Sequence, residues 1–348
     1  MANKITIGLI CGGISGEHGV SIISAYNIQS SLDREKYDVL MIGIDKNGSW
    51  YLGDTKNFFE EVDNVTKVSF RKDFPSGLPQ KNPKNKYKFE TILDNVDVFF
   101  PITHGRFGED GVMQGLLELT GKPYVGSDVF GSAICMDKEV TKKLLLYHGL
   151  PVARYLLIRN PEDYSFQSIV RQLGIPFFVK PCREGSSIGV SKVNFEEEYP
   201  EALKNAFDVD RKVLIEESII GREIECSVLG NDSPEASNVL GEIIPHDKFY
   251  SYEAKYLDKE GADLIIPAKI NSEVRLKIRE TAIEAFLIAE CRGMARVDFF
   301  LCKDNTFIVN EINTLPGFTK ISMYPKLWES SGLPYKKLLD RLIELAIE

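Results

Sequence analysis

Two neighbouring runs near the C-terminal end most constrain how this chain can fold. Residues 294–302 and 306–313 are both rich in strand-forming side chains, and three polar residues separate them. Runs of this kind around a polar turn are typical of a β-hairpin. The first run carries an arginine and an aspartate in alternate positions, and the second carries a glutamate and an asparagine in alternate positions. The hairpin is therefore predicted to gather polar and charged side chains.

The register of this hairpin decides which of those side chains meet. A two-residue turn at 304–305 suits the Asp-Asn pair found there, because both residues tolerate positive φ. That turn pairs Asp298 with Glu311. Further along the strands it pairs Arg296 with Asn313. Because side chains alternate along a strand, all four lie on one face, with opposed Cβ atoms roughly 5 Å apart.

Apolar neighbours predict that both faces of the hairpin are covered. One apolar set falls on the face away from the carboxylates: Val297, Phe299, Leu301, Ile308 and Ile312. A second set flanks the carboxylates: Phe300, Phe307 and Val309. Opposed carboxylates repel each other, and a hard divalent cation such as Mg²⁺, which shares its sites with substrate phosphates, removes that penalty. We therefore predict a metal site at Asp298, Glu311 and Asn313, and chemistry on nucleotide phosphates.

Composition limits the class of protein. The 348 residues allow two or three compact units, and 43% hydrophobic with 27% charged residues is ordinary for a globular protein. A net charge of −9 argues against non-specific nucleic-acid binding. The 6 cysteines are widely spaced without a C-x-x-C pair, which fits a reducing cytoplasm. No signal peptide or membrane-spanning run is recognisable, so we expect a cytoplasmic protein without a membrane partner.

The first part of the chain predicts an α/β fold that opens with a βαβ unit. A strand at 5–11, a helix near 21–32 and a strand at 37–44 surround a glycine-rich turn. A buried strand at 96–102 then ends at a His-Gly-x-x-Gly-Glu-Asp-Gly segment, and ligand sites in open α/β sheets lie at such strand ends. The opening glycines do not match G-x-G-x-x-G, so a nicotinamide site is not favoured.

A second glycine-containing loop carries the clearest phosphate-binding pattern. A strand at 177–180 enters the loop 181–189, which contains Gly-Ser-Ser-x-Gly, and residues 188–193 have a strand pattern. Because a strand follows and no Gly-Lys-Ser/Thr is present, this is not a Walker loop. We predict a hairpin loop that covers phosphates with main-chain N–H groups.

Later segments complete the predicted elements. Helices are expected at 137–148 and 272–291, strands at 213–217 and 223–229, and an amphipathic helix at 333–347.

Six short motifs, which follow one another nearly from end to end, carry a resemblance to a known family. They are Gly12-Gly13-x-Ser15-x-Glu17-His18, His104-Gly105-x-x-Gly108-Glu109-Asp110-Gly111, Met136-Asp137-Lys138, Glu184-Gly185-Ser186-Ser187, Glu253-Ala254-Lys255-Tyr256 and Asn310-Glu311-x-Asn313-Thr-Leu-Pro-Gly317. Together they resemble the D-alanine:D-alanine ligases of the ATP-grasp superfamily.

The resemblance implies a three-domain ATP-grasp fold whose first domain is built on a Rossmann-like parallel sheet. Its expected boundaries are 1–126 for the D-alanine-binding domain, 127–215 for the central subdomain and 216–348 for the C-terminal subdomain with a mobile loop at 246–264. ATP would lie between the central and C-terminal subdomains, and the amino acids between the first and last. The implied reaction joins two D-alanine molecules through a D-alanyl phosphate, releasing ADP and phosphate, for peptidoglycan synthesis. Two Mg²⁺ or Mn²⁺ ions per site and a homodimer are also implied.

The resemblance also assigns roles to individual residues. Catalytic roles fall to Glu17, Ser186, Tyr256 and Arg296, with Arg296 stabilising the tetrahedral oxyanion. Substrate contacts fall to Ser21, His104, Gly317, Ser322 and Met323. ATP contacts fall to Lys138, Lys180, Glu184, Ser187, Glu216, Glu217, Ile219, Glu223 and Lys255.

One departure from the family pattern leaves an alternative open. The usual Glu-His-Glu-Val-Ser reads Glu17-His18-Gly19-Val20-Ser21 here, and Gly19 can loosen the start of the helix. A variant ligase that makes D-alanyl-D-serine or D-alanyl-D-lactate remains an alternative, although a tyrosine at position 256 favours D-alanine as second substrate. A nucleotide-binding regulatory protein without catalysis would be expected to lose a metal ligand or Arg296, and neither is lost.

Overall fold

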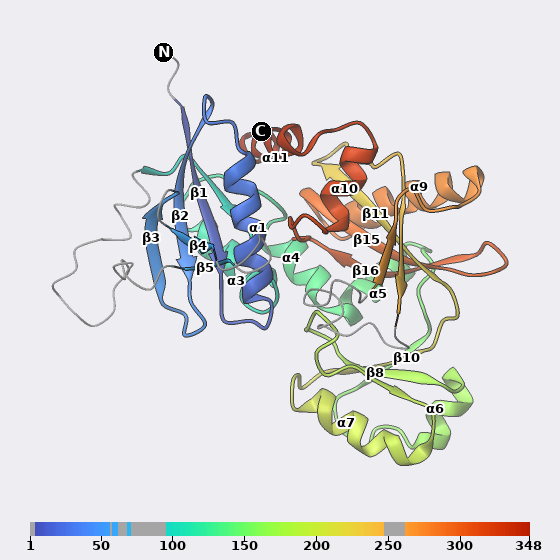
Figure 1. Ribbon diagram of the computed structural model, residues 1–348. Coiled ribbons are helices and arrows are strands. Elements are labelled where there is room, and N and C mark those ends of the chain that lie inside the picture. Colours follow the sequence, from blue (N-terminus) through green and yellow to red (C-terminus); the bar gives the residue numbers. More distant parts are fainter. Residues whose placement is uncertain (1–3, 56–57, 62–67, 71–94, 247–261) are drawn as a thin grey trace.

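The computed structural model describes residues 4–55, 58–61, 68–70, 95–246 and 262–348. The chain forms three units, each built on its own sheet, which meet around a central region (Figure 1). A small separate ribbon pairs β4 (Phe59–Glu61) with β5 (Val68–Phe70). Among the described residues, no helix combines the length and the apolarity needed to cross a membrane.

The first sheet is mostly parallel, as expected. Its order is β3 (Trp50–Asp54), β2 (Tyr37–Ile44), β1 (Ile5–Gly12) and β6 (Val98–Pro101). Strand β1 runs parallel to both β2 and β6, and β3 is an antiparallel edge. Helix α1 (His18–Ser31) follows β1 and packs on it. The loops after β1 and β6 therefore leave the sheet at the same edge, where parallel-sheet proteins bind ligands.

The second sheet is antiparallel and forms the smallest unit. Its order is β7 (Tyr155–Ile158), β10 (Val213–Glu217), β8 (Phe177–Pro181) and β9 (Ser191–Val193). Two helices, α6 (Phe166–Leu173) and α7 (Tyr199–Phe207), share its apolar core, and the short helix η1 (Glu196–Glu198) leads into α7. The predicted strand at 188–193 is shorter than expected, because residues 187–190 form part of the loop instead.

The third sheet carries the predicted hairpin. Its order is β14 (Ala262–Ile265), β13 (Gly241–Pro245), β11 (Arg222–Gly230), β15 (Gly293–Leu301) and β16 (Phe307–Asn313), with β12 (Glu235–Ala236) also paired to β11. Helix α9 (Ser272–Ile288) covers one face and shares the core with Ile224, Val297 and Phe299. Alternate residues of β11 and β15 therefore point to the opposite face, toward the centre of the molecule.

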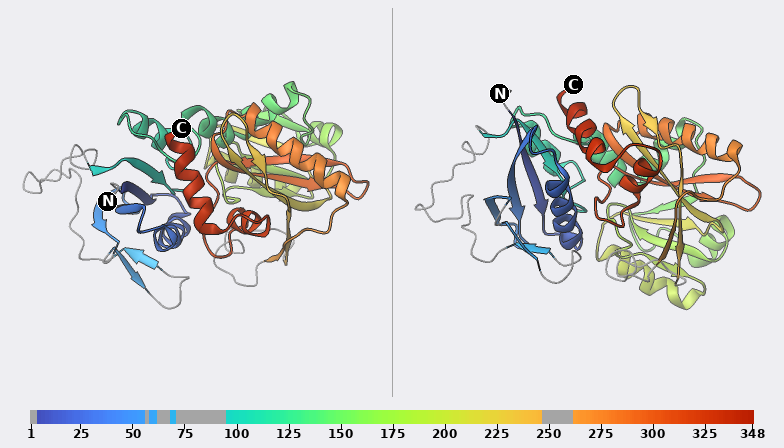
Figure 2. Two further views of the ribbon diagram at one scale, coloured as in Figure 1. Left: turned by 90° about the horizontal axis from the view of Figure 1, so that it is seen from above. Right: turned by 45° about the horizontal axis from the view of Figure 1, so that its top comes forward.

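Two packing arrangements differ from the expected domain boundaries. The expected boundaries include helices α4 (Val129–Met136) and α5 (Lys138–Tyr147) in the central unit, but Cys135 and Leu145 lie in the core of the third sheet. At the other end of the chain, α10 (Met323–Ser330) and α11 (Tyr335–Ile347) share a core with the first sheet. Figure 2 shows α11 running between the first and third units. The first and third units are thus joined by continuous apolar packing.

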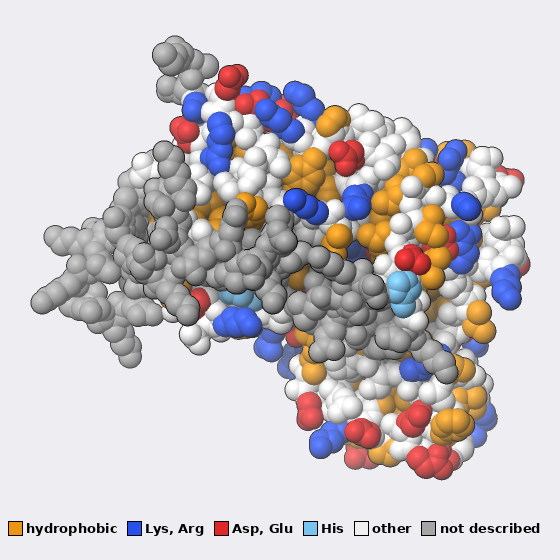
Figure 3. All heavy atoms as spheres, in the orientation of Figure 1, with side chains coloured by type: hydrophobic (Ala, Val, Ile, Leu, Met, Phe, Trp, Pro, Cys, Tyr) orange, Lys and Arg blue, Asp and Glu red, His pale blue; other side chains and the backbone are white. Residues whose placement is uncertain are grey.

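The surface carries charges of both signs. On the face shown in Figure 3, the described Lys and Arg side chains are interspersed with Asp and Glu over all three units. Such mixing is typical of the solvent-facing surface of a folded domain.

Candidate active site

The β15–β16 hairpin has the predicted register at its polar end. Asp298 is opposite Glu311, and Arg296 is opposite Asn313. The loop between the strands differs from the predicted two-residue turn. It has three residues, and the Cys302 N–H donates to the Thr306 carbonyl at 2.8 Å. A bulge lies between Asp298 and Phe299 on one strand, where the partner residue steps from Glu311 to Val309. The longer loop and the bulge shift the register in opposite directions, so they cancel at the carboxylates.

The bulge also changes which apolar residues of the second strand face the core. Because Asn310 is an extra residue on its strand, the side-chain alternation reverses between Val309 and Glu311. Val309 is fully buried in the core under α9, whereas Ile308 is only half-buried. Phe307 packs against the same core. The prediction that put Ile308 on the core face and Phe307 and Val309 beside the carboxylates was therefore wrong.

Asp298 is the centre of a charge network on the inner face of the third sheet. Arg296 donates to both of its oxygens, from Nε to Oδ1 and from Nη2 to Oδ2, each at 2.7 Å. The Asn313 amide donates to the same carboxylate at 3.0 Å. Glu225 on β11 lies opposite Asp298 and approaches the Arg296 Nε at 3.2 Å. Arg296 is therefore held between two carboxylates on neighbouring strands, which fixes its direction.

The oxygen donors of this face suit a hard cation. Asp298 and Glu311 contribute carboxylates and Asn313 an amide oxygen, a donor set that Mg²⁺ or Mn²⁺ accepts together with water and phosphate. Within the described ranges, no cluster of three or more His, Cys, Asp or Glu side chains is arranged to hold a metal by itself. Because three side chains supply fewer oxygens than the coordination shell of such an ion requires, the residues fit an ion that takes part of its coordination from a ligand.

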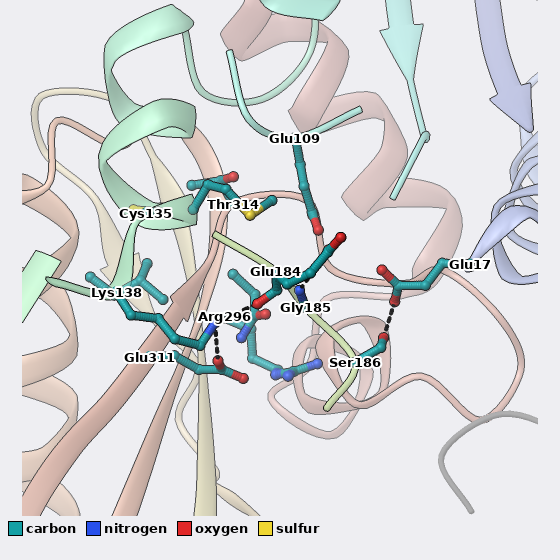
Figure 4. Close-up of a pocket in the computed structure, with 13 residues that line it drawn as sticks. Glu17, Glu109, Cys135, Lys138, Glu184, Gly185, Ser186, Arg296, Glu311 and Thr314 are labelled. Atoms are coloured by element: carbon teal, nitrogen blue, oxygen red, sulfur yellow. Dashed lines mark hydrogen bonds and ion pairs between the residues drawn. The ribbon is translucent and has the colours of Figure 1, made fainter. Parts of the chain in front are cut away.

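A cavity opens above this face where the three units meet. It has an empty volume of about 570 Å³, including space open to solvent. Figure 4 shows side chains from all three units pointing into it. The lining residues are Glu17, Glu109, Cys135, Met136, Lys138, Glu184, Gly185, Ser186, Arg296, Glu311, Ile312, Asn313 and Thr314. The structure thus gathers residues that are far apart in the sequence into one charged, concave site.

Lys138 supplies positive charge to this cavity from the first turn of α5. Asp137 caps that helix by accepting from the Val140 N–H, and it is itself paired with Lys212 at 2.6 Å. The Lys138 ammonium donates to the Glu184 carbonyl at 2.7 Å and lies 3.6 Å from Glu311. The lysine therefore bridges the predicted phosphate loop and the predicted metal face.

The loop predicted to cover phosphates has an unusual backbone conformation. Ser186 and Ser187 both have positive φ, at 50° and 61°. Non-glycine residues in this region are uncommon and are often found where the backbone is arranged for function. The Ser186 hydroxyl donates to Glu17 Oε1 at 2.5 Å, drawn as a dashed line in Figure 4. This contact joins the second unit to the first across the cavity.

Glu17 and His104 come from the two loops at the edge of the first sheet. Ser15 links these loops, because its hydroxyl donates to the His104 carbonyl at 2.7 Å and accepts from the Glu17 N–H at 3.2 Å. The His104 ring donates from Nδ1 to the Leu315 carbonyl at 3.0 Å, and burial lowers the pKa of the ring. Its Nε2 has no hydrogen-bond partner among the residues described. His104 is therefore a neutral ring with an acceptor nitrogen left over.

Ser21 has a different position from the one expected of a substrate contact. It is fully buried, its hydroxyl donates to the Ile102 carbonyl at 2.5 Å, and it accepts from the Gly12 N–H at 2.7 Å. It does not line the cavity. The side chain ties the ends of β1 and β6 together, and so it supports the loops that carry Glu17 and His104.

The predicted adenine segment lies where β10 leaves the second sheet for β11 of the third. Glu216 is buried between two lysines, and Glu217 is held by Arg154, whose Nε donates to it at 2.7 Å. Ile219 is half-buried in the connection itself, and Glu223 lies on β11 opposite Phe300. These four residues therefore follow the seam between the second and third units.

Three residues of the predicted second-substrate subsite cluster at the start of α10. Ser322 precedes the helix, and its hydroxyl accepts from the Thr319 N–H at 2.9 Å. A Cβ on Gly317 would lie 2.8 Å from that hydroxyl oxygen, so no larger residue fits there without movement. Met323 is only 3% exposed, so its main-chain N–H rather than its side chain is suited to meet a ligand.

Two predicted residues, Lys255 and Tyr256, and most of the loop expected at 246–264 lie outside the described residues. Conversely, no role was predicted for three residues in and around the site: Glu109, which lies in a quoted motif and lines the cavity, Lys142 behind the cavity and Glu225 beside Arg296. Burial, with the nearby charge of Glu17, raises the pKa of Glu109 well above its usual value. Lys142 lies one helical turn after Lys138, a spacing that could have indicated a shared helix face.

Comparisons with known proteins cover nearly the whole chain. The model described as "D-ala D-ala ligase N-terminus" matches residues 6–127, and the one described as "D-ala D-ala ligase C-terminus" matches residues 144–344. D-alanine–D-alanine ligase A of Salmonella typhimurium is 48% identical over 354 residues, covering 99% of this chain and 96% of that protein. D-alanine–D-alanine ligase of Oceanobacillus iheyensis is 50% identical over 351 residues, with the same coverage of 99% and 96%.

Solved structures show the same likeness. The D-alanine-D-alanine ligase from Coxiella burnetii is 40% identical with a TM-score of 0.81, covering 99% of this chain and 94% of that one. The VanG D-Ala:D-Ser ligase from Enterococcus faecalis is 32% identical with a TM-score of 0.82, covering 99% and 100%.

Proposed function

The chain belongs to the D-alanine–D-alanine ligase family of ATP-grasp enzymes, and we propose that its central cavity is where two D-alanine molecules are joined at the expense of ATP. The observation that carries the proposal is the meeting of three elements in one cavity: the phosphate loop at Ser186, the hairpin face at Glu311 and the N-terminal carboxylate of Glu17. Each element supplies one requirement of the reaction, namely a phosphate site, a cation-binding face and a site for an ammonium group.

We assign the nucleotide to the seam between the second and third units. Lys138 and Lys180 provide ammonium groups for phosphate oxygens, and the main-chain N–H groups of the loop at Ser186 and Ser187 provide neutral donors. The family generally uses ATP with Mg²⁺ or Mn²⁺, and we propose that Asp298, Glu311 and Asn313 hold two such ions. Those ions would neutralise phosphate charge during transfer.

The first D-alanine is assigned to the region between Glu17 and the hairpin. The Glu17 carboxylate suits the ammonium group of a free amino acid. Among the residues described, His104 Nε2 has no hydrogen-bond partner, so it can accept a hydrogen bond from a donor on the same substrate. The D-alanine carboxylate would then accept the phosphoryl group beside Arg296, forming a D-alanyl phosphate.

The second half of the reaction is assigned to Arg296 and the start of α10. The amine of the second D-alanine attacks the acyl carbon, and the Arg296 guanidinium is directed by Glu225 and Asp298 toward the developing oxyanion. Loss of phosphate from the tetrahedral intermediate leaves D-alanyl-D-alanine. Gly317, Ser322 and Met323 would hold the carboxylate of the second substrate.

The experiment that tests this function measures phosphate release by the purified protein with ATP, Mg²⁺ and D-alanine. We expect release that depends on D-alanine and a product with the mass of the dipeptide. No D-alanine-dependent release would overturn the proposal. The acceptor is tested separately by letting D-alanine, D-serine and D-lactate compete, and a product mass dominated by D-alanyl-D-serine or D-alanyl-D-lactate would favour the variant ligase.

We also expect the protein to act in the cytoplasm, where ATP is available, and to form a homodimer. Light scattering at several protein concentrations would measure the dimer, and a monomer mass throughout would contradict that expectation.

A further inference from the structure

A buried carboxylate between two lysines lies behind the nucleotide seam. Glu216 on β10 is 2% exposed, and one of its oxygens lies 2.5 Å from the Lys180 ammonium. Its other oxygen lies 2.6 Å from the ammonium of Lys142, which comes from α5. The three side chains thus belong to three elements, β10, β8 and α5, that meet at this point.

The two lysines are not equivalent. The Lys142 side chain is only 2% exposed, whereas the Lys180 side chain is 13% exposed. Lys180 and Lys138 are the lysines assigned to phosphate. Lys142 lies one turn after Lys138 on α5, and its ammonium is directed at Glu216 rather than into the cavity. Lys142 therefore cannot reach the nucleotide without displacing the residues around it.

The charges in this group do not balance. One carboxylate faces two ammonium groups, so the group carries one surplus positive charge, and the more exposed cation is the one free to meet an external anion. If Lys142 were absent, Lys180 and Glu216 would form a neutral buried pair. An entering phosphate would then have to break that pair and leave the Glu216 carboxylate buried without a partner, which is costly.

We propose that Lys142 is a positioning residue that serves as the permanent counter-ion of Glu216 and thereby leaves Lys180 free for the nucleotide. The proposal rests on the proposed function, because it assumes that Lys180 binds a phosphate of ATP. Lys142 itself touches no substrate. It acts through Glu216, by compensating the carboxylate when Lys180 turns toward the phosphate.

A purely structural role for Lys142 explains the arrangement less well. Replacing a buried ion pair by well-packed apolar residues is often neutral or stabilising, so stability alone does not require a charge there. Burial also lowers the pKa of Lys142, which means that the protein holds this ammonium against a desolvation penalty. That penalty is explained if the Lys142 charge is needed to compensate Glu216 when Lys180 turns toward the phosphate.

The test compares ATP affinity, measured by calorimetry, in three variants: K142M, E216Q and the double variant K142M/E216Q. K142M keeps most of the side-chain volume and removes the charge. We expect it to weaken ATP binding by about tenfold or more, while the KM for D-alanine changes by less than about twofold. Lys143 is the matched control, because its side chain lies on the same helix but is 65% exposed and pairs with Glu139. K143M should bind ATP as the wild type does.

The double variant separates positioning from simple packing. Without the Glu216 charge, Lys180 has no buried competitor, so K142M/E216Q should bind ATP at least about fivefold more tightly than K142M. A structural ion pair would couple the two residues in unfolding experiments but would leave ATP affinity unchanged in all three variants. Wild-type ATP affinity in K142M, or no recovery in the double variant, would overturn the proposal.

If K142M folds poorly, comparing E216Q with K142M/E216Q provides a second test. Because Lys142 is proposed to act only through Glu216, removing it from the E216Q background should change ATP affinity by less than about twofold. A loss of more than about fivefold in that background would also overturn the proposal. Calorimetric ATP binding does not depend on the acceptor, so a wild type that binds ATP but shows no D-alanine-dependent phosphate release would refute the proposed function instead.

Discussion

Helix α4 packs so closely on the turn before β15 that a glycine-to-alanine change in this helix should destabilise the protein, which is the opposite of what helix propensity predicts. Gly131 lies inside α4, where replacing glycine by alanine usually stabilises a helix by about 1 kcal/mol. Here a Cβ at position 131 would lie 2.5 Å from the Glu290 carbonyl oxygen, which is main chain and cannot rotate away. Ordinary van der Waals contact begins at 3.4 Å, so α4 would have to move by about 0.9 Å.

Several contacts resist that movement. Ser127 accepts a hydrogen bond from the Arg292 N–H at 3.1 Å, and the thiols of Cys135 and Cys291 are 3.5 Å apart. Overpacking a close-packed region costs roughly 1–3 kcal/mol, and a rigid carbonyl favours the upper end of that range. After the gain in helix propensity, we expect Gly131→Ala to lower the free energy of unfolding by about 2 kcal/mol.

Gly115 in α3 (Val112–Glu118) offers the matched control. A Cβ there would meet only the Val129 Cγ2, at 3.8 Å, which is ordinary contact. Gly115→Ala should therefore raise the free energy of unfolding by up to about 1 kcal/mol. Urea unfolding of both variants, followed by circular dichroism, measures a difference between them of about 3 kcal/mol. If Gly131→Ala is as stable as Gly115→Ala, the packing of α4 on that turn is looser than the structure indicates and the reasoning fails.

Three further predictions concern the site. Asp298→Asn keeps the shape of the side chain but removes a charged oxygen ligand, so phosphate release should fall by about a hundredfold or more; undiminished turnover would contradict the metal assignment. Ser186→Ala removes the 2.5 Å bond to Glu17, and kcat should fall by about tenfold while the unfolding midpoint moves little; an unchanged kcat would show that this contact is not needed for the reaction. Burial would raise the pKa of Glu216, but Lys142 and Lys180 outweigh it and lower the pKa from 4.5 to about 2. The stability that ionised Glu216 contributes is therefore fully present above pH 4.5 and is lost as the pH falls toward 2, so unfolding of the wild type and Glu216→Gln should converge in acid. A gap between them that does not change with pH would contradict this linkage.

The hairpin illustrates how much local pattern can predict. Strand-forming runs around a polar turn were sufficient to predict the pairing of Asp298 with Glu311, and that pairing was confirmed. The same pattern did not predict the bulge at Asn310, because an extra residue leaves no mark in a short apolar run. The register at the carboxylates was nevertheless right, since the longer loop shifted it back. The prediction for Ile308 and Val309 had no such compensation and was wrong.

Residues that act behind the site were harder to predict than residues within motifs. Lys142 and Glu225 lie outside every glycine-rich or acidic motif, and each has its role only because another element packs against it. Glu225 approaches Arg296 because β11 pairs with β15, although the two residues are far apart in the sequence. Pairing between strands that are far apart in the sequence depends on tertiary contacts, and no local sequence pattern predicts those contacts.

By itself the sequence determined the α/β class, the approximate bounds of the elements it predicted and the family, because these follow from local periodicity and from short motifs that keep their order. Only the tertiary structure decided how the motifs meet. Helices α10 and α11 pack against the first sheet and bring Glu17 toward the third, and the packing of α5 in the core of the third sheet presents Lys138 to the cavity. The physical reason is that burial and ion pairing are properties of the assembled chain. A lysine on a helix becomes a buried counter-ion only when a strand from elsewhere places a carboxylate beside it.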